Sequence, residues 1–184
     1  MSQNSEKAKL YTRYPVSSVL TYNGSTALHY LLGGVGIIIG YSSWIGLLLG
    51  VLYMVLSFID MYILMPLKVC PNCPYYQINN SLCISGLNIV SRKIASKGDV
   101  KDFVKRANGV LCPNNLYIAS LVVPIIAMIP ALILDFSFLV LTLLLIVVGL
   151  LLFRFFVIFP KIACVHCRAK YKCPQAEAMG VRNL

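Results

Sequence analysis

The chain has 184 residues and a net charge of +10, yet 59% of its residues are hydrophobic and its mean hydropathy is +0.80. Only 12% of the residues are charged, about half the share of a typical soluble domain. The apolar and charged residues are segregated, because residues 27–67 contain a single acidic or basic residue besides His29. This composition excludes an ordinary soluble domain and predicts an integral membrane protein.

The chain alternates between polar and apolar segments. Residues 1–26 are polar, contain nothing like a cleavable signal peptide, and are expected to form a cytoplasmic tail. Residues 27–67 and 116–160 are apolar blocks, each long enough for two spans of about 20 residues. Breaks at 40–44 and 135–137 divide the blocks near their middles. The predicted fold class is therefore all-α integral membrane, with four transmembrane helices in two tandem hairpins.

The first expected span is the least regular of the four. Residues 27–41 are few for a span and contain four glycines. The helix therefore either extends back toward Val16–Tyr22 or lies tilted, with its small residues packed against a neighbour. The next block also has irregular features, because Pro124 and Pro130 interrupt the third span and predict a bend there.

The basic residues predict the orientation. All of the sixteen lysines and arginines except Arg154 lie in residues 1–26, the central loop 68–115 or the tail 161–184. Neither hairpin turn carries any, so the positive-inside rule places both termini and the central loop in the cytoplasm, beneath a plasma membrane. Apolar and basic residues in 85–109 recur at helical spacing, which predicts two short amphipathic helices at the inner membrane surface.

One phrase occurs twice, as "DMYILMPLKVCPNC" at 60–73 and as "RFFVIFPKIACVHC" at 154–167. A charge, a proline and two cysteines stand at matching positions, which predicts an internal repeat of a hairpin and a cysteine motif. Hairpins that start and end on one side are related by an axis along the membrane normal. This symmetry would put Asp60 and Arg154 at the same depth, where we expect them to form a structural ion pair.

The cysteines supply the strongest chemical signal. The spacings are C-x2-C-x9-C in the central loop and C-x2-C-x5-C in the tail, and a C-x2-C turn directs two thiolates toward one ion. The cytoplasm is reducing, which favours metal or redox roles over disulfides. The candidate metal ligands are all seven cysteines of the chain: Cys70, Cys73, Cys83, Cys112, Cys164, Cys167 and Cys173.

Spacing leaves the ligand sets open. The first four cysteines could complete one site, and the last three could add His166, an outside ligand or an open position. Alternatively, the two C-x2-C pairs share a single site. The expected cofactor is an iron–sulfur cluster or zinc.

These features predict a small membrane subunit that anchors a cytoplasmic redox enzyme through a cysteine-ligated metal centre, with electrical connection to the quinone pool as part of the hypothesis. The expected partners are subunits on the cytoplasmic face, the lipid bilayer and quinone, with no nucleic acid. We expect an electron-transfer or non-catalytic role rather than an enzyme. Two alternatives remain: a membrane dithiol–disulfide oxidoreductase, and a structural zinc-stapled scaffold. A metal transporter is less favoured, because the spans lack acidic or histidine linings.

Overall fold

The structure is a computed structural model that describes residues 9–103, 113–173, 176–177 and 179–182. These residues form helices and turns, and no strand occurs among them apart from an isolated bridge between Arg13 and Leu82. Four helices in this part of the chain are long and apolar enough to cross a membrane. The all-helical class expected from the sequence is therefore present, together with four helices that have the length and hydropathy of membrane spans.

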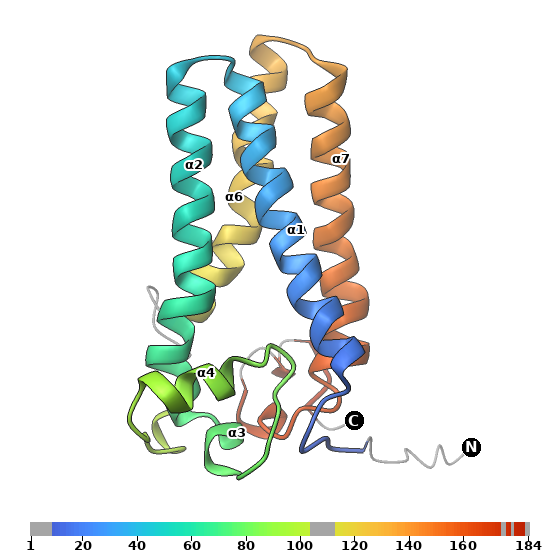
Figure 1. Ribbon diagram of the computed structural model, residues 1–184. Helices are drawn as coiled ribbons and strands as arrows, with labels where there is room; N and C mark the ends of the chain where they lie inside the picture. Colours follow the sequence, from blue (N-terminus) through green and yellow to red (C-terminus); the bar gives the residue numbers. More distant parts are fainter. Residues whose placement is uncertain (1–8, 104–112, 174–175, 178, 183–184) are drawn as a thin grey trace, which may run out of the picture.

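The four long helices form a bundle (Figure 1). Its helices are α1 (Val16–Tyr41), α2 (Trp44–Ile59), α6 (Pro113–Leu134) and α7 (Phe138–Phe153). Two of them continue as π-helical segments, η1 (Asp60–Val69) after α2 and η3 (Arg154–Ala163) after α7. Shorter elements follow at the same end of the bundle: η2 (Cys70–Asn72), α3 (Pro74–Gln77), α4 (Leu87–Ile94) and η4 (Lys170–Lys172).

Both hairpin breaks lie where the sequence predicts them. Between α1 and α2, Ser42 takes a left-handed conformation, and the Ser43 hydroxyl accepts a 3.3 Å hydrogen bond from the backbone N–H of Gly46. This side chain caps the start of α2. The beginning of α1 differs from the boundary expected at residue 27. The helix starts at Val16, directly after Pro15, so the polar residues 21–26 lie within α1.

Helix α1 is the centre of the bundle, because it packs against α2, α6 and α7 (Figure 1). Glycine allows its close approach to the others. A Cβ added at Gly33 would lie 2.7 Å from the Pro124 side chain, and one added at Gly50 would lie 2.7 Å from the Gly34 carbonyl oxygen. The close packing of small residues that the sequence offered as one alternative is therefore present, together with the extension toward Val16.

The cysteine motifs lie together at one end of the bundle, opposite both hairpin turns (Figure 1). We call the segments 9–15, 70–103 and 164–173 at this end the cap. Helix α4 in the cap is amphipathic, with Arg92 and Lys93 in its last turn and exposed Ile89. It corresponds to the first of the two predicted amphipathic helices. Most of the second lies outside the described residues.

Candidate functional site

Each C-x2-C motif follows a helical segment, and the two segments have the same backbone geometry. Pro66 in η1 and Pro160 in η3 lack an N–H and crowd the carbonyl group one turn earlier, which is a common cause of helix distortion. Both segments adopt ten-residue π-helices with proline as the seventh residue. Each helix ends with a hydrogen bond across five residues, from the N–H of Cys70 to Met65 O and, at 2.7 Å, from Cys164 to Phe159 O.

The turn after each π-helix is also the same. The Cys73 N–H donates to Cys70 O at 3.0 Å, and the Cys167 N–H donates to Cys164 O at 3.1 Å. Matching spacing in the sequence thus corresponds to matching local conformation. The internal duplication itself stays a prediction.

The N-terminal segment of the cap joins the two motifs. Tyr14 donates its N–H to Leu82 O at 3.0 Å, next to Cys83, and its hydroxyl group donates to Ala163 O, next to Cys164. The segment therefore crosses from the central loop to the tail and fixes one against the other.

His166 stands between the two cysteines of the second motif and interacts with the N-terminal segment. Its Nδ1 donates to Lys9 O at 2.8 Å, and its ring stacks on Tyr11 with centroids 4.5 Å apart. The Tyr11 N–H in turn donates to His166 O at 3.0 Å. One ring nitrogen of His166 is therefore occupied by the backbone.

Six cysteines lie among the described residues, and all six are free and partly buried: Cys70, Cys73, Cys83, Cys164, Cys167 and Cys173. Burial raises the pKa of the Cys73 thiol well above its ordinary value, and the neighbouring Cys167 thiol raises it further. Burial, followed by the nearby Cys173 and Cys83 thiols, raises the pKa of Cys167 to about 12. Thiols from both motifs therefore lie near enough to influence one another.

The thiols are close without forming a compact ligand set. In the described part of the chain, no three Cys, His, Asp or Glu side chains converge as a metal ion requires. Four thiolates on a single zinc ion would each lie about 2.3 Å from it. Cys112, a predicted ligand, lies outside the described residues. The metal centre and its ligand set stay predictions.

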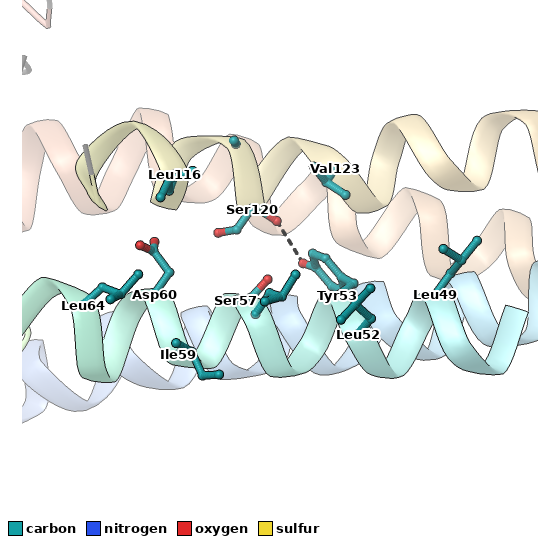
Figure 2. Close-up of a pocket in the computed structure, with 12 residues that line it drawn as sticks. Leu49, Leu52, Tyr53, Ser57, Ile59, Asp60, Leu64, Leu116, Ser120 and Val123 are labelled. Carbon is teal, nitrogen blue, oxygen red and sulfur yellow. Dashed lines mark hydrogen bonds between the residues drawn. The ribbon is translucent and has the colours of Figure 1, made fainter. Parts of the chain in front are cut away.

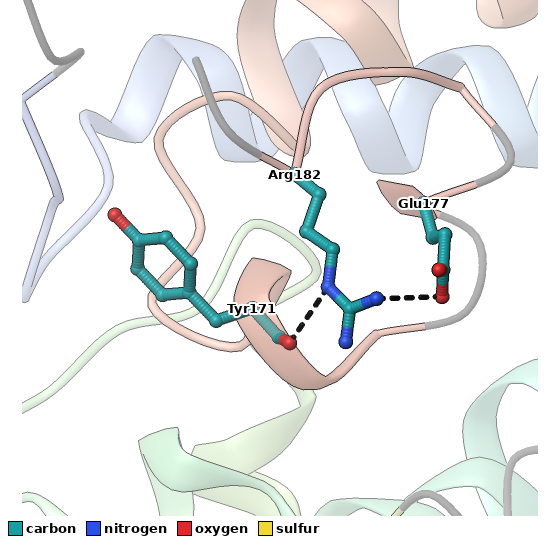
Figure 3. Close-up of polar contacts among 3 residues, drawn as sticks. All are labelled: Tyr171, Glu177 and Arg182. Atoms are coloured by element: carbon teal, nitrogen blue, oxygen red, sulfur yellow. Dashed lines mark hydrogen bonds and ion pairs between the residues drawn. The ribbon is translucent and has the colours of Figure 1, made fainter.

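The end of the tail folds back on η4 (Figure 3). Arg182 forms a 2.8 Å ion pair with Glu177, and its Nε donates to Tyr171 O at 2.9 Å. These contacts hold Glu177 and Arg182 beside η4. The pair is solvent-exposed, so its contribution to stability is small.

Arg154 does not pair with Asp60, which corrects the expectation from the sequence. Its side chain is 1% exposed, and it bonds to residues of α1 instead. The guanidinium donates to Ser25 Oγ at 2.8 Å, Thr26 Oγ1 at 2.6 Å and Tyr22 O at 3.3 Å. It therefore satisfies its donors with hydroxyl and carbonyl oxygens, which removes the need for a carboxylate.

Two aromatic rings complete the surroundings of this guanidinium. Tyr117 of α6 accepts a hydrogen bond from Arg154 through its hydroxyl group. The Arg154 Cζ atom also lies 5.1 Å from the centroid of the Tyr22 ring and 5.6 Å from that of Tyr117, which are cation–π distances. Arg154 thus connects η3 to both α1 and α6. Sequence reasoning missed the partners in α1 because it assigned residues 22–26 to the tail.

Asp60 lies apart from this cluster, on the side of α2 and η1 that faces α6 (Figure 2). Its side chain is 5% exposed, and neither carboxylate oxygen has a hydrogen-bonding partner. It lines a mostly apolar cavity of about 420 Å³ between these helices. Among the described residues of the four long helices and their π-helical ends, the two Asp60 oxygens and the Nδ1 atom of His29 are the buried side-chain atoms without a hydrogen-bonding partner.

Comparisons of the chain with protein-family models, with curated proteins and with solved structures found no match.

Proposed function

We propose that the chain is a small membrane protein whose cap holds a thiolate-bound metal centre, either an iron–sulfur cluster or zinc. The observation that carries this proposal is the arrangement of the two C-x2-C turns. Matched π-helical ends present them, and the segment 9–15 ties them together. Paired C-x2-C turns are the backbone framework that zinc and iron–sulfur sites use.

The electrostatics of the cap support a cation among the thiols. Thiolates at Cys73 and Cys167 would repel each other, and their burial adds a desolvation cost. A bound metal cation reverses this balance, because it attracts every thiolate at once and keeps its ligands deprotonated. A dithiol enzyme needs the opposite environment, one that lowers the pKa of its attacking cysteine.

The proposed role is to anchor, and electrically connect, a cytoplasmic redox enzyme to the membrane quinone pool. Two features support it. Segment η1 runs without interruption from the membrane part of α2 to Cys70, so a centre in the cap would adjoin the bilayer. The lysines and arginines gathered at this end also favour a cytoplasmic cap in the plasma membrane, available to cytoplasmic subunits.

Metal analysis of the purified full chain tests this proposal. We expect iron with acid-labile sulfide and visible absorption, or else zinc without colour. Cys73→Ser and Cys167→Ser should each lower the bound metal, whereas the control Ser96→Ala at an exposed cap position should not. Protein that binds neither metal when purified without oxygen would contradict the proposal and favour the dithiol oxidoreductase. Zinc alone would favour the structural scaffold over electron transfer.

A further inference from the structure

The cavity between α2, η1 and α6 has the size and the lining of a ligand site. Its volume of about 420 Å³ lies within the usual range for small-molecule pockets. Five of its twelve lining residues are leucines: Leu116 from α6, and Leu49, Leu52, Leu56 and Leu64 from α2 and η1. Figure 2 shows the Asp60 side chain directed from this wall toward α6. The site therefore combines an apolar body with a single acidic group.

Two other polar residues around the cavity, Tyr53 and Ser120, have partners within the protein. The Tyr53 hydroxyl donates to Ser120 O at 2.9 Å across the space between α2 and α6 (Figure 2). The Ser120 hydroxyl donates to Tyr117 O at 2.7 Å and lies 2.9 Å from the Tyr30 hydroxyl. Asp60 alone offers two acceptor oxygens without partners. A ligand that fits must bring hydrogen-bond donors.

The depth of Asp60 narrows the class of ligand. Asp60 lies eight residues before Lys68, which is at most about 12 Å along the axis at the rise of an α-helix. With Lys68 at the membrane surface, Asp60 lies inside a hydrocarbon core that is about 30 Å thick. Lipid headgroups lie at the surface of that core. A charged amine would have to give up its hydration to reach this depth. A neutral, lipid-soluble molecule with hydroxyl groups can reach Asp60, because it enters the hydrocarbon core and has no charge to dehydrate.

The residues that line the cavity do not favour a partner helix as its occupant. Membrane helices pack closely through small residues, whereas the lipid-facing part of this wall carries large side chains such as Leu52, Leu56 and Val123, each roughly half exposed. These side chains and the Tyr53 ring suit a planar ring with an apolar tail.

We propose that this cavity binds a quinol, with its ring between α2 and α6 and one of its two hydroxyl groups donating to the Asp60 carboxylate. The inference deepens the proposed function and rests on it for the choice of a redox carrier. The ligand lies close to the cap, because Asp60 is the first residue of η1 and Cys70 directly follows its last, at most about 15 Å apart along the axis at the rise of an α-helix.

The test uses the full chain in nanodiscs and three related probes. These are a decyl-substituted hydroquinone, its dimethyl ether and the corresponding quinone, each titrated calorimetrically without oxygen and corrected with empty nanodiscs. Only the hydroquinone carries hydroxyl donors. We expect it to bind at least about tenfold more tightly than either analogue, because they leave the carboxylate unpaired.

Binding to variants tests whether the hydroquinone occupies this cavity. Asp60→Asn should remove this preference, while Asp135→Asn, an exposed acid at the far hairpin turn, should leave it unchanged. Leu56→Trp should block the cavity with Asp60 intact, which gives a second readout that does not depend on the acid. Equal binding of the hydroquinone and its ether, or unchanged binding by both Asp60→Asn and Leu56→Trp, would overturn the inference.

The metal content of the same samples separates the two proposals. A protein with its metal centre but without hydroquinone binding would overturn the quinol site alone. A protein that binds the hydroquinone through Asp60 but holds no metal would overturn the proposed function alone.

Discussion

Arg154 donates a 2.6 Å hydrogen bond to the side-chain oxygen of Thr26, and this contact joins the last membrane segment to the first. The two residues are separated by most of the chain. The same guanidinium reaches Ser25 and Tyr117, so a single buried side chain connects η3 with α1 and α6. The tertiary connection expected between Asp60 and Arg154 is thus made by hydroxyl groups instead of a carboxylate.

Replacing Arg154 should destabilise the bundle. Arg154→Met leaves the hydroxyl groups of Thr26 and Tyr117 without this partner, and we expect a loss of about 2–3 kcal/mol in the free energy of unfolding. Arg154→Lys should recover only part of this, because an ammonium group lacks the broad fork of a guanidinium. Unfolding in mixed detergent measures the loss, and Lys161→Met, at an exposed position on the same segment, is the control.

Asp60 should behave independently of Arg154. In a double-mutant cycle, the losses from Asp60→Asn and Arg154→Met should add to within about 0.5 kcal/mol, as for sites without shared contacts. A coupling energy well above that value would restore the ion pair and contradict the contacts described for Arg154.

Gly33 of α1 should tolerate no side chain where it faces Pro124 of α6. Gly33→Ala puts a methyl group within 2.7 Å of Pro124, so one helix must shift, and we expect a loss of roughly 1–3 kcal/mol. Gly149→Ala in α7 is the matched control, because nothing lies within 4 Å of its added Cβ. That control should be neutral or slightly stabilising, since alanine favours helix more than glycine. Similar losses in both variants would mean that helix propensity, not packing, explains the result.

The sequence predicted the helices better than their contacts. Hydropathy located both hairpin breaks, because Ser42 and Asp135 interrupt otherwise unbroken apolar blocks. It missed the start of α1, since Ser25 and Thr26 look like tail residues until Arg154 supplies their partner. The orientation of Arg154 depends on how three helices cross, and one-dimensional spacing does not contain that information.

For the cysteine motifs too, the sequence predicted the local structure better than the contacts. Their spacing predicted matched turns, and Pro66 and Pro160 marked where the helices distort. The π-helical form was not predictable, because proline is also compatible with a kink or a helix end. The role of segment 9–15 was also missed, since its contacts with the motifs are mostly through the backbone.

The cap thiols should react slowly in metal-free protein. The pKa of Cys164, raised to about 12 from an ordinary 9.0 mainly by burial, keeps its thiol neutral at pH 8, and only thiolates are good nucleophiles. Alkylation of Cys164 at pH 8, followed by mass spectrometry, should be at least about tenfold slower than that of an exposed Ser96→Cys thiol. Equal rates would show that Cys164 is neither buried nor perturbed.

The same shift predicts how stability depends on pH. The folded pKa lies above that of the unfolded thiol, so above pH 9.0 the folded metal-free protein holds protons that the unfolded chain releases. This contribution is therefore complete below pH 9.0 and is lost as the pH rises from there toward about 12. A metal-free Cys164→Ala variant should lose less stability over that range, and an identical loss would contradict the assignment.

The cap should face the cytoplasm. The basic residues at its end of the bundle predict this orientation, whereas the turn at Ser42–Ser43 carries no charge. With the native cysteines blocked or replaced, a cysteine at Ser43 should react with an impermeant reagent added outside intact cells. One at Ser96 should react only after the membrane is opened, and the reverse pattern would invert the topology.

The central claim is that both C-x2-C motifs serve metal binding in one cap. Its most direct test is the metal content of Cys73→Ser, Cys167→Ser and the double variant, each measured with the quantity of folded protein. Cys83→Ser serves as a further comparison, because it stands outside both pairs. If the motifs share one centre, each single variant should lose most of the metal, and the double variant should lose no more than either. Full metal content in both single variants, at unchanged protein yield, would contradict the account.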